Sequence, residues 1–447
     1  MNIAMIGTGY VGLVSGACLA KIGHHVICVD RESAKIDALL RGEIPIYEPD
    51  LDSLVTEAHG DGRLAFTTDL DDAVDRSDII FLAVGTPPAG DGRSDLSQVE
   101  AAAKQIAKSA TQSKIVVVKS TVPVGTCRRV GRILAKHGGG VDFKVASNPE
   151  FLREGAAIAD FMEPDRIVIG TNDAACERVM REIYAYFDDQ DVPMVSASLE
   201  TSELIKYSAN AFLATKVAFI NEMANLCDAT GADIEALSEG IGLDQRIGKA
   251  FLKPGPGYGG SCFPKDTLAL TILAQEADCP VRIVESVVDS NSFHIRRLGR
   301  RIAEFCADSW GVERTLPLLN RRIGVLGLAF KANTDDIRSA ASTVIVPLLI
   351  KQGAEVIGYD PEAGAAAGAA IQHLEVAGSM DEAMKDVDAV LVLTEWDEIR
   401  EIDWASKKAH MKSPVVVDFR NLYDTEAMAA LGFSYASLGR PVVQAVR

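Results

Sequence analysis

The sequence predicts an α/β protein: two Rossmann-like, doubly wound parallel-sheet domains joined by a helical central domain with a long spine helix. Three observations support this prediction. Short β-type runs alternate with helix-type stretches at the start of the chain, a long helical region follows, and strand–helix alternation returns near the end. We expect the three domains to span residues 1–197, 198–307 and 321–447.

The N-terminal alternation indicates a parallel sheet covered on both faces. The predicted strands are Asn2–Ile6, His25–Val29, Ile79–Val84, Ile115–Lys119 and Lys144–Ser147. Helical spacing and good helix formers occupy the segments between them, such as Val11–Lys21 and Leu96–Ala110. Because helices then follow strands repeatedly, we expect them to pack on both sides of one sheet.

The central region reads as helical. Leu199–Thr230 contains neither proline nor internal glycine and is too long for an ordinary crossover. Further predicted helices are Ala232–Gly240, Asp266–Ala277 and Ile283–Phe305. Asp308–Asn320 lacks clear periodicity and is predicted to be a linker.

The last part of the chain predicts a second, smaller parallel sheet. Its strands would be Arg322–Leu326, Glu355–Tyr359, Ala389–Leu393 and Val415–Asp418. The alanine-rich patch Ala363–Ala370 would be a loop or the start of a helix. Phe330 stands where a dinucleotide fingerprint needs its third glycine, so we do not expect a second dinucleotide here.

Composition limits the classes of partner. The chain has 447 residues and a formal net charge of −18, which should repel nucleic acid and anionic membranes. We find neither a cleavable leader nor a membrane-length apolar run, and expect a cytoplasmic protein with free thiols. Neither the eight cysteines nor the seven histidines have metal-ligand spacing, so no metal site is expected.

A glycine fingerprint at the N-terminus predicts a dinucleotide site. Gly7 allows a tight turn, Gly9 lets the backbone approach a pyrophosphate, and Gly12 permits close contact between helix and strand. Asp30 ends the next predicted strand, where a carboxylate can bind both ribose hydroxyls and repel a 2′-phosphate. NAD is therefore favoured over NADP, although the adjacent Arg31 keeps NADP open.

The string GPGYGGSCFPKD over residues 255–266 contains a second glycine-rich loop, which is followed by Cys262. Cys262 directly precedes a predicted helix with Pro264 near its first turn. The helix dipole and the adjacent Lys265 should both favour the thiolate. Most cysteines are structural, but the glycine run together with Lys265 and Asp266 indicates a reactive one.

At this point the chain resembles the UDP-glucose/GDP-mannose dehydrogenase family. The resemblance extends over nearly the whole chain through ordered motifs: MIGTGYVGL, VGTPP, STVPVGT, SNPEFLREG, ELIKYSANAFLA, GYGGSCFPKD, GLAFKANTDDIR and VVDFRN. It implies an N-terminal NAD domain, a helical spine carrying a dimer contact, and a C-terminal nucleotide-sugar domain. A homodimer or higher homo-oligomer is therefore expected.

The resemblance also implies a reaction. A nucleotide sugar, UDP-glucose by the spelling of the cysteine motif, would be oxidised through an aldehyde to the uronate, with two NAD as acceptors. The Cys262 thiolate would form a thiohemiacetal and then a thioester that water hydrolyses. GDP-mannose is the near alternative, and an N-acetylated sugar nucleotide is a more distant one. Two further alternatives are a two-electron alcohol dehydrogenase and a non-catalytic nucleotide-sugar-binding regulator.

The family's residue roles carry over to matching positions. Lys206 and Asn210, four residues apart on one helix face, would stabilise an oxyanion, and Asp266 would help order the water. Thr121 would hold a water near the alcohol, and Glu150 would act as base. The implied cofactor-binding residues are Gly7, Gly9, Tyr10, Val11, Gly12, Asp30, Lys35, Thr86, Ser120, Thr121, Glu154, Lys265 and Arg338. The implied substrate-binding residues are Glu150, Phe151, Leu152, Lys206, Asn210, Arg246, Lys253, Tyr258, Gly259, Lys331 and Arg420, of which Arg246 would reach a neighbouring subunit's site.

Overall fold

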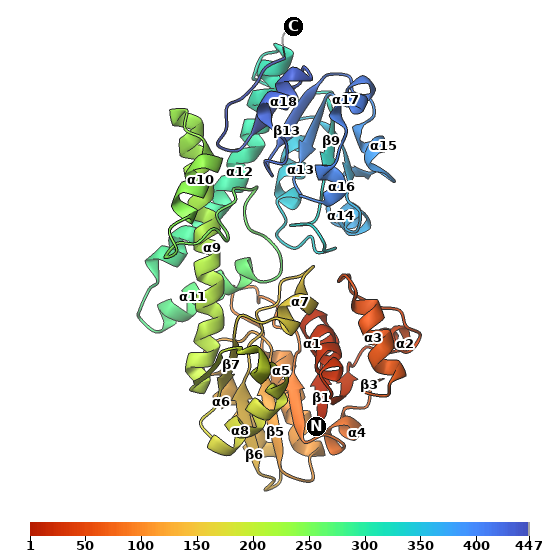
Figure 1. The fold of residues 1–447 in the computed structure, drawn as a ribbon, viewed down its shortest axis with the longest axis vertical. Helices are drawn as coiled ribbons and strands as arrows, with labels where there is room; N and C mark the ends of the chain where they lie inside the picture. Colours follow the sequence, from red (N-terminus) through yellow and green to blue (C-terminus); the bar gives the residue numbers. More distant parts are fainter. Residues whose placement is uncertain (446–447) are drawn as a thin grey trace. The chain divides into compact units, whose positions relative to one another are not determined.

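A computed structural model describes residues 1–445 (Figure 1), which group into two compact units. The first unit comprises Met1–Ala209 and Ala269–Pro280, and the second comprises Asn210–Leu268 and the described part of Val281–Arg447. Each unit contains one sheet. The predicted division into three domains stays a prediction.

The first unit is built on an eight-stranded sheet with the order β3-β2-β1-β4-β5-β6-β7-β8. Its strands are β1 (Asn2–Ile6), β2 (His25–Val29), β3 (Leu64–Thr67), β4 (Ile79–Leu82), β5 (Lys114–Val118), β6 (Phe143–Ser147), β7 (Ile167–Gly170) and β8 (Met194–Ala197). The first six are parallel, but β7 runs antiparallel to β6, and β8 is parallel to β7. An antiparallel extension at the edge of a parallel sheet is common in doubly wound folds.

Helices cover both faces of this sheet. The helices are α1 (Tyr10–Lys21), α2 (Ser33–Leu40), α3 (Leu51–Gly60), α4 (Leu70–Asp75), α5 (Ser97–Ser109), α6 (Thr126–His137), α7 (Ala157–Met162), α8 (Ala174–Ile183) and the 3₁₀ helix η1 (Ala185–Gln190). Alternate strand residues divide between two cores: Met5 packs with α1, α3 and α8, whereas Ile6 packs with α4, α5 and α6. This alternation is the period of a strand buried on both faces.

The second unit holds a six-stranded, fully parallel sheet with the order β11-β10-β9-β12-β13-β14. Its strands are β9 (Arg322–Leu326), β10 (Glu355–Tyr359), β11 (Leu374–Val376), β12 (Ala389–Val392), β13 (Val415–Asp418) and β14 (Ser434–Ser437). Its helices are α10 (Ile234–Gly242), α12 (Arg282–Trp310), α13 (Ser342–Lys351), α14 (Gly364–Ala370), α15 (Met380–Met384), α16 (Asp397–Arg400), α17 (Trp404–Lys407), η2 (Lys408–His410) and α18 (Thr425–Ala430). The long α12 lies against α13 and shares its hydrophobic core (Figure 1).

Two helices, α9 (Leu199–Thr230) and α11 (Phe263–Glu276), contain the points where the chain passes from one unit to the other. The long helix predicted from the absence of proline and glycine is confirmed at both of its ends. The predicted start of the linker is wrong, because α12 continues to Trp310 and ends on Gly311 in the left-handed conformation. No helix among residues 1–445 is long and apolar enough to cross a membrane.

Candidate active site

The fingerprint turn between β1 and α1 needs its glycines for different reasons. A Cβ on Gly7, whose φ is +104°, would lie 2.6 Å from the carbonyl oxygen of Ala83, and one on Gly12 would lie 2.0 Å from the oxygen of Gly7. A Cβ on Gly9 would meet nothing within 4 Å. Gly7 and Gly12 therefore satisfy packing, whereas Gly9 leaves open space at the N-terminus of α1. That arrangement fits the approach of a pyrophosphate to free backbone N–H groups.

Asp30 follows β2 and faces this turn. Its Oδ2 accepts hydrogen bonds from the Thr8 backbone N–H (3.0 Å) and the Thr8 hydroxyl (2.8 Å). Burial acts to raise the pKa of Asp30, but hydrogen bonds from Glu32 and Thr8 outweigh it and lower the pKa below its ordinary value. The carboxylate is thus held ionised, as a ribose-binding acid requires. Lys35 pairs with Glu32 at 2.9 Å on the adjoining helix.

Tyr10 and Val11 open α1, and Tyr10 has a partner that the sequence did not indicate. The Tyr10 hydroxyl donates a hydrogen bond to Glu48, whose Oε2 also accepts from Gly155 N (2.6 Å) and whose Oε1 accepts from Ala157 N (2.7 Å). Burial, reinforced by Glu48, raises the pKa of Tyr10. Glu48 therefore ties the fingerprint helix to the N-terminus of α7. The only signal was an acid in the loop string YEPD, without apolar periodicity around it.

The loops after β4 and β5 meet at the carboxyl edge of the sheet. Thr86 donates its hydroxyl to the Thr121 carbonyl at 2.9 Å, and Ser120 donates its hydroxyl to the Val84 carbonyl at 2.6 Å. The predicted cofactor residues Thr86 and Ser120 thus hold the two loops together. The Thr121 hydroxyl makes no hydrogen bond with any residue from 1 to 445, so it can hold a water as predicted.

Glu150 and Lys206 form a buried ion pair. The Lys206 Nζ lies 3.2 Å from the Glu150 Oε1, and the two side chains are 4% and 5% exposed, respectively. Glu150 also accepts a hydrogen bond from the Leu152 backbone N–H at 2.5 Å. The Lys206 ammonium lies 5.3 Å from the centre of the Phe151 ring. The structure therefore brings together these four predicted residues, from the loop after β6 and from α9.

A buried lysine near the Glu150–Lys206 pair was not predicted from the sequence. Lys119, at the end of β5, donates to the Asn148 side-chain oxygen at 3.0 Å, and the Tyr184 hydroxyl donates to the same oxygen at 2.5 Å. Burial lowers the pKa of Lys119 to about 8, with the Glu150 carboxylate opposing part of that effect. Asn148 also donates to the Val168 carbonyl at 2.9 Å, so every polar group of its side chain is engaged. This network fixes the turn that presents Glu150, and Glu154 lies half-buried farther along the same loop.

Cys262 directly precedes α11 in the second unit. Its carbonyl accepts the first helical hydrogen bond, from Asp266 N at 2.8 Å, and its sulfur lies 3.4 Å from the Ser261 hydroxyl oxygen. Asp266 is fully buried and binds two partners: Asn210 donates to it at 2.6 Å and Lys265 at 2.5 Å. A thiol, an amide, an ammonium and a carboxylate are therefore clustered at one helix N-terminus. Sequence predicted all four.

The glycines before Cys262 are packed closely against other parts of the protein. A Cβ on Gly259 would lie 2.4 Å from the Ser339 carbonyl oxygen, and one on Gly260 would lie 2.7 Å from the Phe330 ring. Tyr258 is buried, and its backbone N–H and carbonyl are both bound by Asn291 at 2.9 and 3.0 Å. The loop is thus held rigidly by α12 and by the segment after β9.

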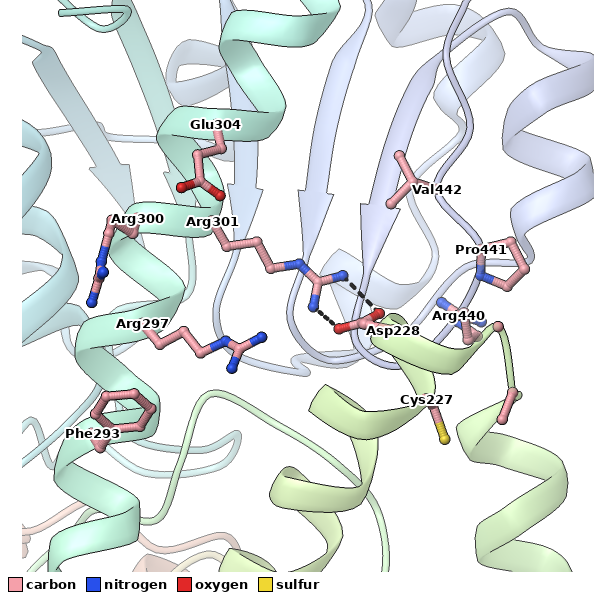
Figure 2. A pocket seen from close by; sticks show the side chains of 12 residues that line it. Cys227, Asp228, Phe293, Arg297, Arg300, Arg301, Glu304, Arg440, Pro441 and Val442 are labelled. Carbon is pink, nitrogen blue, oxygen red and sulfur yellow. Dashed lines mark hydrogen bonds and ion pairs between the residues drawn. The ribbon is translucent and has the colours of Figure 1, made fainter. Parts of the chain in front are cut away.

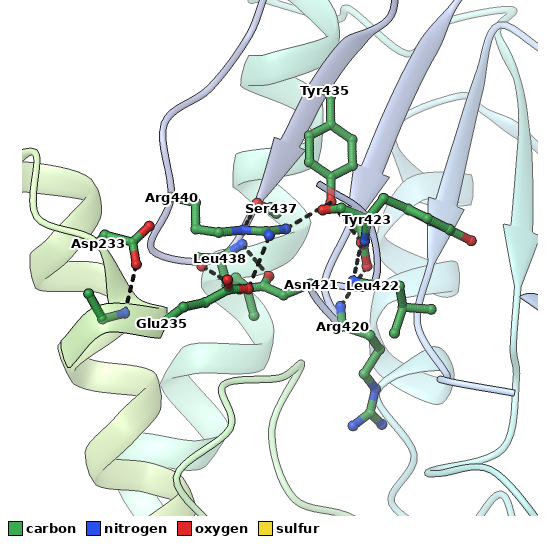
Figure 3. A network of polar contacts seen from close by, with 12 residues as sticks. Asp233, Glu235, Arg420, Asn421, Leu422, Tyr423, Tyr435, Ser437, Leu438 and Arg440 are labelled. Carbon is green, nitrogen blue, oxygen red and sulfur yellow. Dashed lines mark hydrogen bonds and ion pairs between the residues drawn. The ribbon is translucent and has the colours of Figure 1, made fainter. Parts of the chain in front are cut away.

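Arg420, at the end of β13, is directed inward. Its guanidinium lies 2.8 Å from the Glu395 carboxylate and donates to the carbonyls of Leu393 and Phe330, both at 2.7 Å. Figure 3 shows the network that holds the loop after β13 beside the end of β14. In it Asn421 exchanges two hydrogen bonds with Leu438, of 2.8 and 2.9 Å.

Lys253 and Lys331 are the other predicted phosphate-binding cations. Lys253 lines a cavity of about 330 Å³ together with Ser238, Lys249 and Asn421. The Lys331 ammonium lies 5.6 Å from the centre of the Phe330 ring, next to the backbone that Arg420 holds. The carboxyl ends of parallel strands are where α/β sheets bind ligands, and Arg420 and Lys331 follow β13 and β9 at that edge.

Arg246 and Arg338 are not brought into either cluster. Arg246 is 88% exposed on its side chain and pairs with Asp244 only two residues earlier. Arg338 is 66% exposed and pairs with Asp336 in the same manner. Their predicted roles, reaching a neighbouring subunit and approaching the cofactor, remain predictions.

Asp360 shows how the second sheet differs from the first. It follows β10 as Asp30 follows β2, but Asp360 is 5% exposed and accepts from Leu328 N (2.7 Å), Ala329 N (2.9 Å) and the Trp396 indole (3.1 Å). A carboxylate so occupied by its own chain has little capacity left for a ribose. This supports the expectation that the second sheet does not bind a dinucleotide.

Comparison with known proteins agrees with these features. Three family models match: the NAD binding domain of the UDP-glucose/GDP-mannose dehydrogenase family over residues 1–188, its central domain over 200–292 and its UDP binding domain over 324–425. The UDP-glucose 6-dehydrogenase of Rhizobium meliloti (strain 1021) is 50% identical over 99% of this chain and 100% of its own length. The UDP-glucose 6-dehydrogenase TuaD of Bacillus subtilis (strain 168) is 46% identical over 99% of this chain and 94% of its own length.

Solved structures give the same result. A UDP-glucose dehydrogenase from Pyrobaculum islandicum superposes with a TM-score of 0.88, with 36% identity and 98% of each chain covered. A UDP-D-ManNAc dehydrogenase from Pyrococcus horikoshii superposes with a TM-score of 0.85, with 26% identity, covering 98% of this chain and 99% of that one. Both sheets, the fingerprint and the cysteine loop are thus explained together: the chain belongs to the UDP-glucose/GDP-mannose dehydrogenase family.

Proposed function

We propose that this protein oxidises UDP-glucose to UDP-glucuronate with two NAD as acceptors, through a covalent intermediate on Cys262. The names of its full-length relatives support the substrate, because UDP-glucose 6-dehydrogenases are 50% and 46% identical to the chain. The observation that carries the chemistry is the position of Cys262 at the N-terminus of α11 beside the buried Asn210–Asp266–Lys265 cluster.

Bound NAD would accept one hydride from the sugar C6 in each of the two oxidations. Between them, the Cys262 sulfur attacks the C6 aldehyde and forms a C–S bond, and the carbonyl oxygen takes a proton to give a thiohemiacetal. Loss of the second hydride and of the hydroxyl proton leaves a thioester. Water then breaks the C–S bond, releasing the uronate and regenerating the thiol of Cys262.

The N-terminus of a helix and a nearby ammonium both favour an ionised thiol. Cys262 has the first turn of α11 behind it and Lys265 three residues later. The Lys265 ammonium is bound to the Asp266 carboxylate at 2.5 Å, which fixes its position on the first turn of the helix that follows Cys262. We assign Lys265 the role of positioning Asp266 and stabilising the thiolate.

Lys206 and Asn210 stand one turn apart on α9 and project from one face of it. An ammonium and an amide N–H₂ on one helix face are suitable donors to an oxygen that becomes negative when the thiolate attacks. Glu150, paired with Lys206, is the base that we assign to the thioester-hydrolysing water. Asp266, whose two oxygens are both bound, would orient that water rather than take its proton.

The stoichiometry of NADH tests the proposal. We expect two NADH per UDP-glucose consumed at completion with excess NAD, and no turnover of GDP-mannose under the same conditions. Cys262→Ala should lose uronate formation while retaining NAD binding, and Cys279→Ala, which changes an exposed cysteine, should behave as the unmodified protein. One NADH per sugar, or full uronate formation by Cys262→Ala, would contradict the covalent mechanism.

A further inference from the structure

A cavity of about 660 Å³ lies wholly within the second unit and contains none of the residues to which we assign catalysis or substrate binding. Its walls come from the end of α9, from α12 and from the segment after β14. The charged residues that line it are Asp228, Arg297, Arg300, Arg301, Glu304 and Arg440. Four guanidinium groups against two carboxylates leave a local excess of positive charge in a chain whose net charge is −18.

The guanidinium groups fall into two classes. Arg301 forms an ion pair with Asp228 and donates to the Ser437 carbonyl, and Arg440 lies 3.1 Å from Glu235 and donates to the Tyr435 hydroxyl at 2.9 Å. These two arginines hold the cavity walls together. Arg297 and Arg300 have no hydrogen bond or ion pair with any residue from 1 to 445.

Figure 2 shows the directions in which the arginine side chains of the cavity extend. Arg297 and Arg301 extend from α12 to the same side, toward Asp228, and Arg440 and Pro441 face them from the C-terminal segment. Arg300 leaves the helix in another direction and borders the cavity at its rim. An acidic protein gains nothing in stability from unpaired, clustered cations, because like charges on one helix repel.

We propose that this cavity is a binding site for a small molecule that carries a di- or triphosphate. Guanidinium groups bind phosphate oxygens through paired N–H donors, and Arg297 has all of its donors available. The volume lies within the range of small-molecule pockets, roughly 300–1,000 Å³, and is large for one phosphate. Arg301 and Arg440, each already paired with a carboxylate, keep two further guanidinium groups in the cavity wall.

Calorimetric titration with inorganic triphosphate, in the presence of saturating UDP and NAD, tests this site. The two catalytic ligands occupy the anion sites of the proposed reaction, so the remaining binding reports on the cavity alone. We expect one triphosphate per chain, and a loss of affinity of about tenfold in Arg297→Ala, the size expected for losing one charged hydrogen-bonding group. Arg296→Ala is the matched control, because Arg296 is an exposed neighbour on α12 outside the cavity lining. Arg297→Lys should recover part of the loss.

Three outcomes would overturn the proposal. One is the absence of triphosphate binding at low salt with the catalytic ligands present. Another is an equal loss in Arg296→Ala and Arg297→Ala, which would indicate general charge attraction. The third is a change of oligomeric state in Arg297→Ala without any triphosphate binding by the unmodified protein, which would make the cavity a protein contact. Because the readout is binding rather than turnover, failure here leaves the proposed function unaffected.

Discussion

At the scale of single residues, the buried pair of Glu150 and Lys206 couples stability to chemistry. Both side chains are almost fully buried, at 5% and 4% exposure, so neither charge can be solvated if its partner is removed. The same two groups are those to which we assign base catalysis and oxyanion stabilisation. If a substitution of Glu150 or Lys206 lowers activity, the stability of that variant must therefore be measured as well.

Replacing Lys206 by methionine should destabilise the protein by about 3–5 kcal/mol, because it leaves the Glu150 carboxylate buried without its cation. Urea denaturation measures the change. Arg181→Ala removes one cation from an exposed pair with Glu177 and should cost less than about 1 kcal/mol. Equal stability of Lys206→Met and the unmodified protein would show that the folded state does not depend on Lys206 as the counter-ion of Glu150.

Site residues that belong to a sequence motif could be predicted. Residues that enter the site only because of how the chain packs could not. Cys262, Asp266, Lys206 and Asn210 stand in ordered motifs, and the structure places each in a polar cluster. Lys119 was not predicted to be a site residue, because a lysine at the end of a strand usually reaches solvent. Only the fold shows that it ends beside Asn148 in the interior.

At the scale of elements, different glycines of the turn from β1 to α1 serve packing and ligand binding. Gly12 lies inside α1 against the Gly7 backbone, whereas Gly9 caps the helix with an ordinary φ of −74°. An added methyl group would therefore clash at Gly12. At Gly9 it would only project into the space where we place the pyrophosphate.

We expect Gly12→Ala to lower the free energy of unfolding by at least about 1–3 kcal/mol through overpacking. Gly9→Ala should leave that free energy within about 0.5 kcal/mol and weaken NAD binding by on the order of tenfold. Chemical denaturation and a fluorescence titration with NADH distinguish the two effects. Full NAD affinity in Gly9→Ala would mean that the cofactor does not approach this backbone.

Most central strands were predicted from the sequence, whereas the edge strands and the central strand β7 were not. β1, β2 and β10 have the predicted bounds because they are apolar runs buried on both faces. The strands that the sequence analysis did not predict include β3, β8, β11 and β14, which form the sheet edges. An edge strand such as β8 is only half covered, so its MVSA sequence mixes polar and apolar residues and resembles a loop.

At the scale of the whole molecule, His294 links α12 to the glycine loop and makes stability depend on pH. Its Nε2 lies 2.9 Å from the Gly255 carbonyl, which requires a proton on that nitrogen, and Nδ1 lies 3.4 Å from the Asn225 amide nitrogen. Burial, with Arg297 and Arg301 adding to it, lowers the pKa of His294 from 6.5 to about 4. The folded protein therefore holds a neutral imidazole where the unfolded chain holds an imidazolium.

Because the unfolded state binds the extra proton between these two pKa values, this contribution to stability is complete above pH 6.5 and decreases as pH falls toward 4. The loss attributable to His294 should reach up to about 3 kcal/mol. The difference between the unmodified protein and His294→Gln, followed by urea denaturation from pH 7 to 4.5, should shrink with falling pH. Exposed His410→Gln should show no such convergence, and a constant difference for His294→Gln would refute the assignment.

The resemblance predicts that Arg246 completes the site of a neighbouring subunit, and mixing two variants tests this at the level of the assembly. Arg246 is 88% exposed and, among residues 1–445, forms its ion pair with Asp244. Arg246→Ala should therefore leave stability within about 0.5 kcal/mol while weakening UDP-glucose binding more than NAD binding. Arg282→Ala, with 79% exposure and a similar local partner, is the matched control.

If Arg246 acts across subunits, a hybrid of Arg246→Ala and Cys262→Ala subunits contains one site with both an intact cysteine and an intact arginine. Denaturing the two variants together and refolding them should then give more NADH production than the sum of the two refolded separately. Activity equal to that sum would place Arg246 in its own subunit's site, or outside the reaction altogether. The extra NADH production depends on how many hybrid assemblies form. Native mass spectrometry of the refolded mixture measures the fraction of hybrids, and the expected rate is calculated from that fraction.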